Sequence, residues 1–206
     1  SEPLDRLLVS AFRTANNPYL GLVVGRDNHH GKLDLLGNLL ASADTLDAAL
    51  QTLLDYKNLL VPYLSFSYHR GDQRVRMDVV PNSKLQFAHT RPHAELVISS
   101  IVSVARSLAG GELPLLCIGF MHEQPEDLTL YHEIFNCPIE FGCETNRIEV
   151  SFDILNTPLP SAYPQYHQRL RALADATFRD IERAPGPAAH VLTSLEPVLG
   201  RDETNT

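Results

Sequence analysis

The chain has no tryptophan, only three cysteines and no long apolar run. Cys117, Cys137 and Cys143 form an odd number without a CxxC pair, which predicts reduced, mostly buried thiols in a cytoplasmic protein. Cys137 and Cys143 are close enough in sequence to meet across a turn, so a disulfide between them stays open. No stretch approaches the roughly 18 apolar residues of a membrane span. We therefore expect a cytoplasmic location and no membrane partner.

Positive charge is also scarce. Lys and Arg number 17 against 25 Asp and Glu, which gives a net charge of −8. Proteins that bind nucleic acids neutralise phosphates with Lys and Arg. The charge balance argues against direct DNA binding by this chain alone.

Motifs for catalysis and metal binding are incomplete. His132 begins an HExxH pattern, but Asn136 stands where the second His is required, and His122 fails likewise at Glu126. GxSxG, GxGxxG and GxxxxGK patterns are absent. We expect no catalytic residue, no metal and no cofactor. A small-molecule enzyme remains the minor alternative, because a triad assembled in space leaves no sequence motif.

The pattern of apolar residues predicts an α+β fold, with helices packed on an antiparallel sheet of about four or five strands and a long C-terminal helix. The segment 20–25 fits either a strand or a helical turn, and Asp44 is expected to cap the helix that follows it. Helices are predicted over 4–15, 33–40, 45–63, 92–110, 128–136 and 163–183, and strands over 64–68, 75–79, 115–120, 139–141 and 147–152.

A few polar side chains interrupt otherwise apolar helices. Such groups suit a small-ligand pocket, which is mostly apolar with a few placed polar groups. They equally suit boundary positions that are satisfied locally, and both interpretations stay open. The candidate ligand-binding residues are Asn38, Tyr56, Ser100, Ser103 and Arg106.

The last long helix carries apolar residues at near-heptad spacing. This pattern fits a dimer contact, and it also fits packing on the helix's own domain. The candidate dimerisation residues are Tyr166, Leu170, Leu173, Thr177 and Ile181.

Four stretches carry a family resemblance, namely residues 17–25, 35–50, 56–60 and 127–160. The last contains Phe135-x-Cys137-Pro138-x-x-Phe141-Gly142, in which we expect Phe135 and Phe141 to pack inward and Pro138 to set the turn. Together the stretches cover nearly the whole chain. Their order and spacing resemble the N-terminal effector-binding domain, of the arabinose-binding type, of AraC/XylS-family transcriptional regulators.

The resemblance implies a sensor rather than an enzyme. It implies a small-molecule effector, a homodimer, and DNA binding only through a C-terminal helix-turn-helix domain that this chain lacks. Residues 1–183 would form the effector-binding and dimerisation domain, and residues 184–206 a short helix and linker. The acidic charge agrees, because the DNA-reading surface would lie elsewhere. The effector stays unnamed, and an effector-independent dimerisation module is the main alternative.

Overall fold

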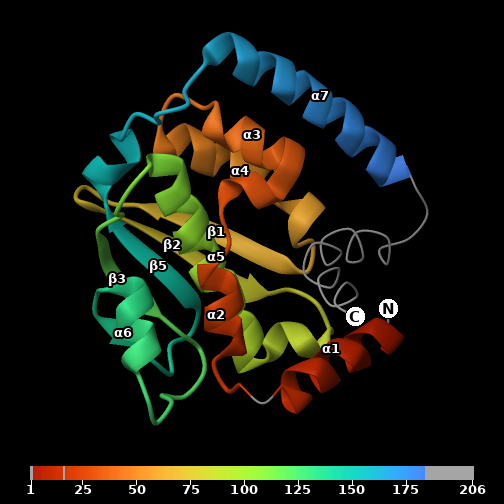
Figure 1. Cartoon of the computed structure of the whole chain (residues 1–206), viewed down its shortest axis with the longest axis vertical. Helices are drawn as coiled ribbons and strands as arrows, with labels where there is room; N and C mark the ends of the chain where they lie inside the picture. The colour runs from red at the N-terminus through yellow and green to blue at the C-terminus, as the bar shows by residue number, and fades with distance from the viewer. Residues whose placement is uncertain (1, 16, 184–206) are drawn as a thin grey trace, which may run out of the picture.

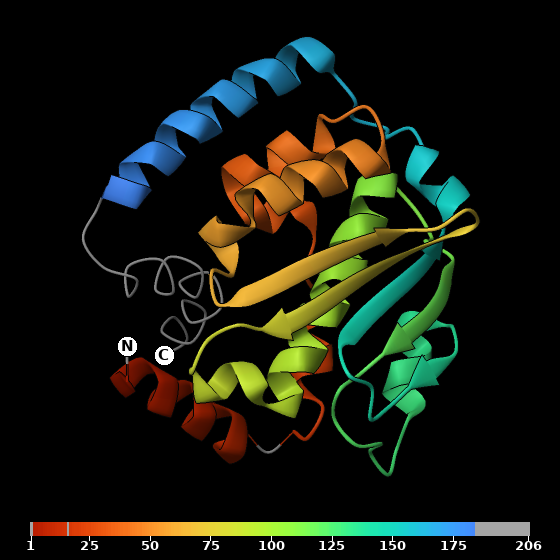
Figure 2. The same ribbon diagram turned by 180° about the vertical axis from the view of Figure 1, so that it is seen from behind.

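The protein is built on one five-stranded sheet with helices on one of its faces (Figures 1 and 2). The computed structural model describes residues 2–15 and 17–183. The strand order is β1-β2-β5-β3-β4, and every neighbouring pair is antiparallel except β3 and β4. This confirms the α+β expectation and shows that the sheet is mixed. The strands are β1 (Leu64–Arg70), β2 (Arg74–Pro81), β3 (Leu115–Gly119), β4 (Ile139–Glu140) and β5 (Asn146–Ser151).

Two helices form the centre of the helical layer. Helix α5 (Arg91–Ala109) lies on the sheet, and α2 (Leu20–Arg26) lies on α5 (Figure 1). Residues 20–25, for which the sequence left a strand and a helical turn open, are therefore helical. The glycines of α2 allow a close approach, because a Cβ on Gly21 would lie 2.0 Å from the carbonyl oxygen of Pro92. Gly25 meets α5 in the same way, so only glycine fits at these two positions.

The remaining helices surround this centre, and their bounds agree with the predicted ones to within a few residues. Helix α7 runs outside α3 and α4 (Figures 1 and 2). The elements are α1 (Glu2–Thr14), α3 (Asp34–Ala41), α4 (Leu46–Leu60), α6 (Thr129–Phe135) and α7 (Pro164–Arg183), with short 3-10 helices η1 (His30–Leu33), η2 (Gln86–His89) and η3 (Phe152–Asn156).

The expected cap of α4 is wrong by one residue. Thr45 is the N-cap, with extended backbone angles, and its hydroxyl accepts a hydrogen bond from the Ala48 N–H at 3.3 Å. Asp44 lies one residue earlier, where its carbonyl accepts from the backbone N–H of Leu159. A capping side chain must sit at the residue where the backbone enters the helix, and Asp44 does not.

The corner between α6 and β4 packs inward. Phe135 is 1% exposed, and the half-buried Phe141 stacks on Phe120 with ring centroids 5.9 Å apart. Asn136 ends α6 in the left-handed region, with φ of 48°. The inward placement of both phenylalanines is confirmed. The cysteines at 117, 137 and 143 are free thiols, so the disulfide left open above is not formed.

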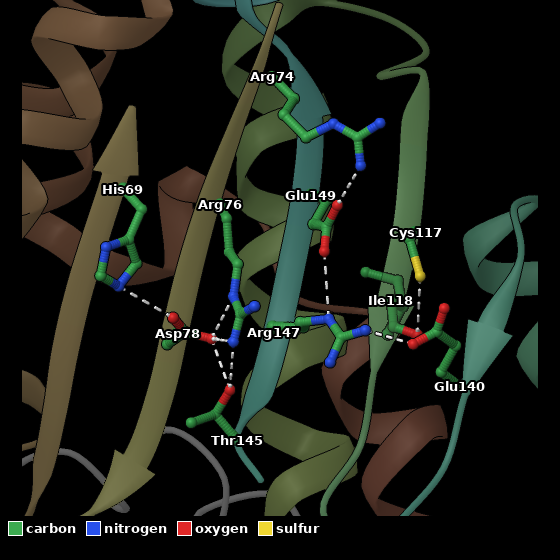
Figure 3. A network of polar contacts seen from close by, with 10 residues as sticks. All are labelled: His69, Arg74, Arg76, Asp78, Cys117, Ile118, Glu140, Thr145, Arg147 and Glu149. Atoms are coloured by element: carbon green, nitrogen blue, oxygen red, sulfur yellow. Dashed lines mark hydrogen bonds and ion pairs between the residues drawn. The ribbon is translucent and has the colours of Figure 1, made fainter. Parts of the chain in front are cut away.

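The opposite face of the sheet carries ion pairs. In Figure 2 the strands face the viewer with α5 behind them, and no described helix lies in front. Asp78 lies 2.8 Å from Arg76 and 3.2 Å from His69 (Figure 3). Burial alone would raise the pKa of Asp78, but hydrogen bonds from Arg76 and Thr145 outweigh it and lower that pKa. Arg147 joins the second half of this network by pairing with acidic residues of two strands (Figure 3).

No helix among residues 2–15 and 17–183 has the length and apolar content to cross a membrane.

Candidate functional site

A cavity lies between α5 and the sheet, which we call the α5–sheet cavity. Its volume is about 10 Å³, enough for about one water molecule. Strands β1, β2 and β5, the end of η2 and one face of α5 form its walls. It is lined by seven apolar residues, Leu64, Val79, Pro81, Ala88, Ala94, Val97 and Ile98, and by two polar ones, His93 and Asn146.

The His93 ring is the first polar group of the cavity. It is 4% exposed and packs against the rings of Tyr63 and Phe87, with centroids 5.5 and 5.2 Å away. Its Nε2 lies 3.4 Å from the Tyr63 hydroxyl, and the ring also hydrogen-bonds the backbone of Ala88. Burial lowers the pKa of His93 to about 4, so the ring is neutral at physiological pH.

Asn146 supplies the second polar group. Asn146 is 6% exposed, and its side-chain oxygen accepts a hydrogen bond from the Met121 N–H at 3.0 Å. A backbone N–H needs an acceptor, so this bond fixes the orientation of the amide. The group that Asn146 can present to a bound molecule is therefore its NH₂ donor.

Helix α1 holds the η2 wall of the cavity in place. The Asp5 carboxylate accepts hydrogen bonds from the backbone N–H groups of Gln86 and Phe87, at 3.0 and 2.9 Å. These are the first N–H groups of η2, which have no partner inside the short helix. Asp5 thus caps η2 from a distant part of the chain.

A buried carboxylate lies on the other side of α5. Glu95 has no solvent exposure, and its Oε1 accepts from the Tyr131 hydroxyl and, at 2.6 Å, from the Arg91 Nε. Its Oε2 has no hydrogen-bond partner among the described residues. Burial raises the pKa of Glu95, and the bonds from Tyr131 and Arg91 offset this only in part. Arg91 also donates to the Pro18 carbonyl at 2.8 Å, so the cluster joins α5 and α6 to the turn that precedes α2.

The predicted ligand residues on α3 and α4 lie away from the cavity. Asn38 is exposed, and its side-chain amide donates to the Asp34 carbonyl at 3.0 Å. Tyr56 is 4% exposed, and its hydroxyl donates to the Asp175 carboxylate of α7. Burial and the Asp175 carboxylate raise the pKa of Tyr56 to about 12. Neither residue lines the α5–sheet cavity.

The predicted ligand residues on α5 face neighbouring helices and loops. The Ser100 hydroxyl accepts from the Asn28 amide at 2.7 Å, and Ser103 is half-buried. Arg106 donates to the Ile134 carbonyl of α6 at 2.5 Å. None of the three lines the cavity, so the structure does not bring the five predicted residues together.

The predicted dimerisation residues divide between two sides of α7. Leu170 is 8% exposed and faces the chain's own core, whereas Tyr166 and Leu173 are 44% and 54% exposed. Thr177 is exposed as well, and the side chain of Ile181 lies outside the described part of the chain.

Polar contacts also attach α7 to the body of the domain. His167 Nδ1 lies 3.0 Å from the Leu39 carbonyl, and Arg171 pairs with Asp55 of α4 at 2.5 Å. Together with buried Leu170, these contacts seat the inner side of α7 on α3 and α4. The exposed flank is therefore distinct from the packed one.

Sequence reasoning missed His93, Glu95 and Asn146. The signal was present for the first two, because His93 precedes Val97 by one helical turn and Glu95 precedes Ile98 by three residues. A polar residue whose spacing places it on the core-facing side of a helix is expected to have a hydrogen-bond partner. Asn146 begins a strand, and no periodicity marked it. In the described ranges, no group of three His, Cys, Asp or Glu is placed to hold a metal ion.

Comparison with known proteins decides the family. The model of the arabinose-binding domain of AraC transcription regulators, N-terminal, matches residues 2–159. The chain belongs to this family. It is thus an AraC-type ligand-binding domain of a transcriptional regulator, and the proteins it resembles are regulators rather than enzymes.

Two Pseudomonas aeruginosa proteins are similar to this AraC-type domain. The ornithine utilization regulator is 25% identical over 182 residues, covering 88% of this chain and 53% of that protein. The crystal structure of the transcriptional regulator CdpR matches with a TM-score of 0.71 and 24% identity, covering 96% of this chain and 64% of that one. The second likeness shows the fold. The chain spans about half the length of its curated relative, and the linker expected over 184–206 lies outside the described residues.

Proposed function

We propose that this chain is the sensing and dimerisation domain of a cytoplasmic AraC-type regulator, and that a small-molecule effector binds in the α5–sheet cavity. The effector would modulate DNA binding by a C-terminal domain of the longer protein. The supporting observation is a cavity with apolar walls and two neutral polar groups, in a family of regulator ligand-binding domains. The cytoplasmic location follows from the need of such a regulator to reach DNA.

The effector would act by shifting a conformational population. It can do so only if it binds one arrangement of the domain more tightly than another. The cavity walls belong to α5, η2 and the sheet. Because α5 also contacts α2 and α6, a change in its position would alter the packing of the helical layer.

The size of the cavity keeps a second function in view. Its volume of about 10 Å³, which holds about one water molecule, is far below the roughly 300–1,000 Å³ of common ligand pockets. An effector larger than water would therefore need an arrangement in which α5 lies farther from the sheet, and an effector-independent dimerisation module is the alternative.

Native mass spectrometry of the purified chain tests the choice. We expect a co-purified small molecule in the wild type and none in Ala94→Leu, which places a larger side chain in the cavity lining. The matched control is Ala105→Leu, on the same helix, half-buried and outside the lining; it should keep the ligand. A ligand retained equally by both variants would remove the cavity as its site. Absence of any bound molecule, with unchanged regulation by Ala94→Leu in the longer protein, would favour the dimerisation module.

We further propose that the exposed flank of α7, formed by Tyr166, Leu173 and Thr177, makes the homodimer contact. The exposed apolar area of Tyr166 and Leu173 supports this choice. Leu170 serves internal packing in the single chain. Ile181 continues the same sequence spacing toward the end of α7.

A further inference from the structure

We propose that the buried Glu95 cluster binds a small organic cation that carries N–H donors, such as a primary ammonium, in the place that the guanidinium of Arg91 occupies in this structure. The cluster consists of Glu95 and Arg91 of α5, Tyr131 of α6, Tyr19 directly before α2, and His122, which follows β3. None of these residues lines the α5–sheet cavity. The cation site is therefore separate from the site of the effector.

Two buried acceptors of the cluster lack donors. Glu95 has no solvent exposure, and in the described part of the chain neither its Oε2 nor the buried Nε2 of His122 has a hydrogen-bond partner. Burial lowers the pKa of His122, so the ring is neutral. Its Nδ1 lies 2.8 Å from the Glu123 carbonyl oxygen, which can only accept, so Nδ1 carries the proton and Nε2 is an acceptor. A ligand that meets these atoms must bring hydrogen-bond donors.

The surroundings of the two acceptors favour a positive charge on the ligand. Tyr131 donates to Glu95 Oε1. Its ring packs edge-on against those of Tyr19 and Phe141, with centroids 6.3 and 5.5 Å away. Aromatic faces attract cations, and a buried carboxylate needs a partner charge. Arg91 already supplies one, because its Nε lies 2.6 Å from Glu95 Oε1 and its guanidinium lies 5.2 Å from the centre of the Tyr19 ring.

The space for the ligand comes from the side chain of Arg91 and requires no internal cavity. Arg91 is the first residue of α5, and its side chain is 31% exposed, whereas that of Glu95 is fully buried. Its other bond goes to the Pro18 carbonyl at the surface, at 2.8 Å. Rotation of Arg91 into solvent frees the volume of a guanidinium group beside Glu95. An ammonium group fits this volume, and the rest of the ligand follows the path of the Arg91 side chain to the surface.

Binding exchanges one cation for another. A buried carboxylate left without a partner charge is costly, so Arg91 departs only when the ligand takes its place. The ligand therefore competes with Arg91 for Glu95. The displaced Arg91 also gives up its bond to Pro18, so binding removes a contact between α5 and the turn before α2.

Three probes with four carbon atoms separate the requirements for charge and for donors. They are n-butylammonium, tetramethylammonium and 1-butanol, and their binding to the wild-type chain is measured by isothermal titration near neutral pH. We expect n-butylammonium to bind on the order of 10-fold more tightly than 1-butanol, which has no charge, and than tetramethylammonium, which has no N–H donor. Equal binding of the three probes would overturn the proposal.

Two variants of the cluster test the competition. Arg91→Ala removes the competing cation, so it should bind n-butylammonium on the order of 10-fold more tightly than the wild type, and the ligand should raise its unfolding temperature. Glu95→Gln keeps the shape of the side chain and removes its charge, so binding should be lost. Arg74→Ala is the control, because Arg74 pairs with Glu149 on the opposite face of the sheet at 3.2 Å. It should bind n-butylammonium like the wild type.

The remaining outcomes separate the cation site from the α5–sheet cavity. Ala94→Leu changes the lining of that cavity and should bind n-butylammonium like the wild type. Loss of binding in Ala94→Leu but not in Glu95→Gln would assign the cation to the cavity and overturn the site at Glu95. Absence of binding in both the wild type and Arg91→Ala would also overturn it and would leave the effector proposal standing. If Arg91→Ala does not fold, the wild-type series and Glu95→Gln decide.

Discussion

Glu95 is a carboxylate that is fully buried in the core. A carboxylate without solvent exposure depends on donors from Tyr131 and Arg91. Tyr131→Phe keeps the ring and removes one donor, so we expect the free energy of unfolding in urea to fall by about 1–3 kcal/mol. Tyr163→Phe is the control, because Tyr163 is 57% exposed. An equal decrease in the free energy of unfolding in the two variants would show that the hydrogen bond from Tyr131 to Glu95 does not stabilise the fold.

His93 predicts how stability depends on pH. Its folded pKa of about 4 lies below the ordinary 6.5, so the folded state binds its proton less readily than the unfolded state. The resulting stability is complete above pH 6.5 and is lost as the pH falls toward 4, by on the order of 3 kcal/mol. His30 and His122 have lowered pKa values, for reasons that begin with burial, and act in the same direction.

The measurement is a series of urea unfolding curves between pH 4 and 7 (about the range over which a neutral His can gain its proton). His93→Asn should flatten the loss without removing it. His132→Asn, at an exposed site on α6, should follow the wild type. A pH profile of His93→Asn that superimposes on the wild type would show that His93 is not responsible.

At the scale of the element, the junction between η1 and α3 is strained. Asp34 has φ 45° and ψ −120°, a conformation that glycine adopts readily and other residues rarely do. The strain costs about 1–3 kcal/mol, whereas an acidic residue in the first helical turn contributes only about 0.3–1 kcal/mol. Strain outweighs the charge, and Asp34→Gly should therefore raise the free energy of unfolding by about 1 kcal/mol.

Asp34→Ala separates the two effects. It removes the carboxylate and keeps the strain, so thermal unfolding should occur at or below the wild-type temperature. If the glycine variant were no more stable than the alanine variant, the backbone strain would have no energetic consequence.

Helix α7 shows why element boundaries are easier to predict than element faces. The heptad-like spacing located the helix to within one residue at its start. The same spacing cannot tell which partner covers it, because a helix packs on its own domain and on another copy by the same rules. Leu170 lies inward and Leu173 outward, although both belonged to one predicted stripe.

At the scale of the whole molecule, the proposed dimer can be tested by sedimentation equilibrium. The wild type should sediment as a dimer, and Leu173→Asp as a monomer, because a carboxylate would lie in the apolar contact. Ala172→Asp is the control, since it adds the same charge at the neighbouring exposed position, which faces another side of the helix. Leu170→Asp is unsuitable because it would disrupt internal packing. A dimer in Leu173→Asp would exclude this flank.

Much of the fold could be predicted from the sequence, and little of the candidate site. Periodicity located α5 and the hairpin of β1 and β2 because one face of each is apolar. Periodicity gave no information on the parallel pairing of β3 with β4, since that depends on contacts between distant segments. It also selected Tyr56 as a pocket residue, whereas the hydroxyl is used by Asp175 of α7.

The sequence by itself determined the family, the α+β class and the position of most elements, because local spacing and motif order encode them. Only the tertiary structure decided which polar groups share a space. His93 and Asn146 are 53 positions apart in the chain and meet at one cavity because the pleat of β5 and the face of α5 point them toward the same volume. The pleats of β2 and β5 turn Asp78 and Arg147 to the opposite face of the sheet. Convergence of this kind depends on packing in three dimensions, which no local pattern records.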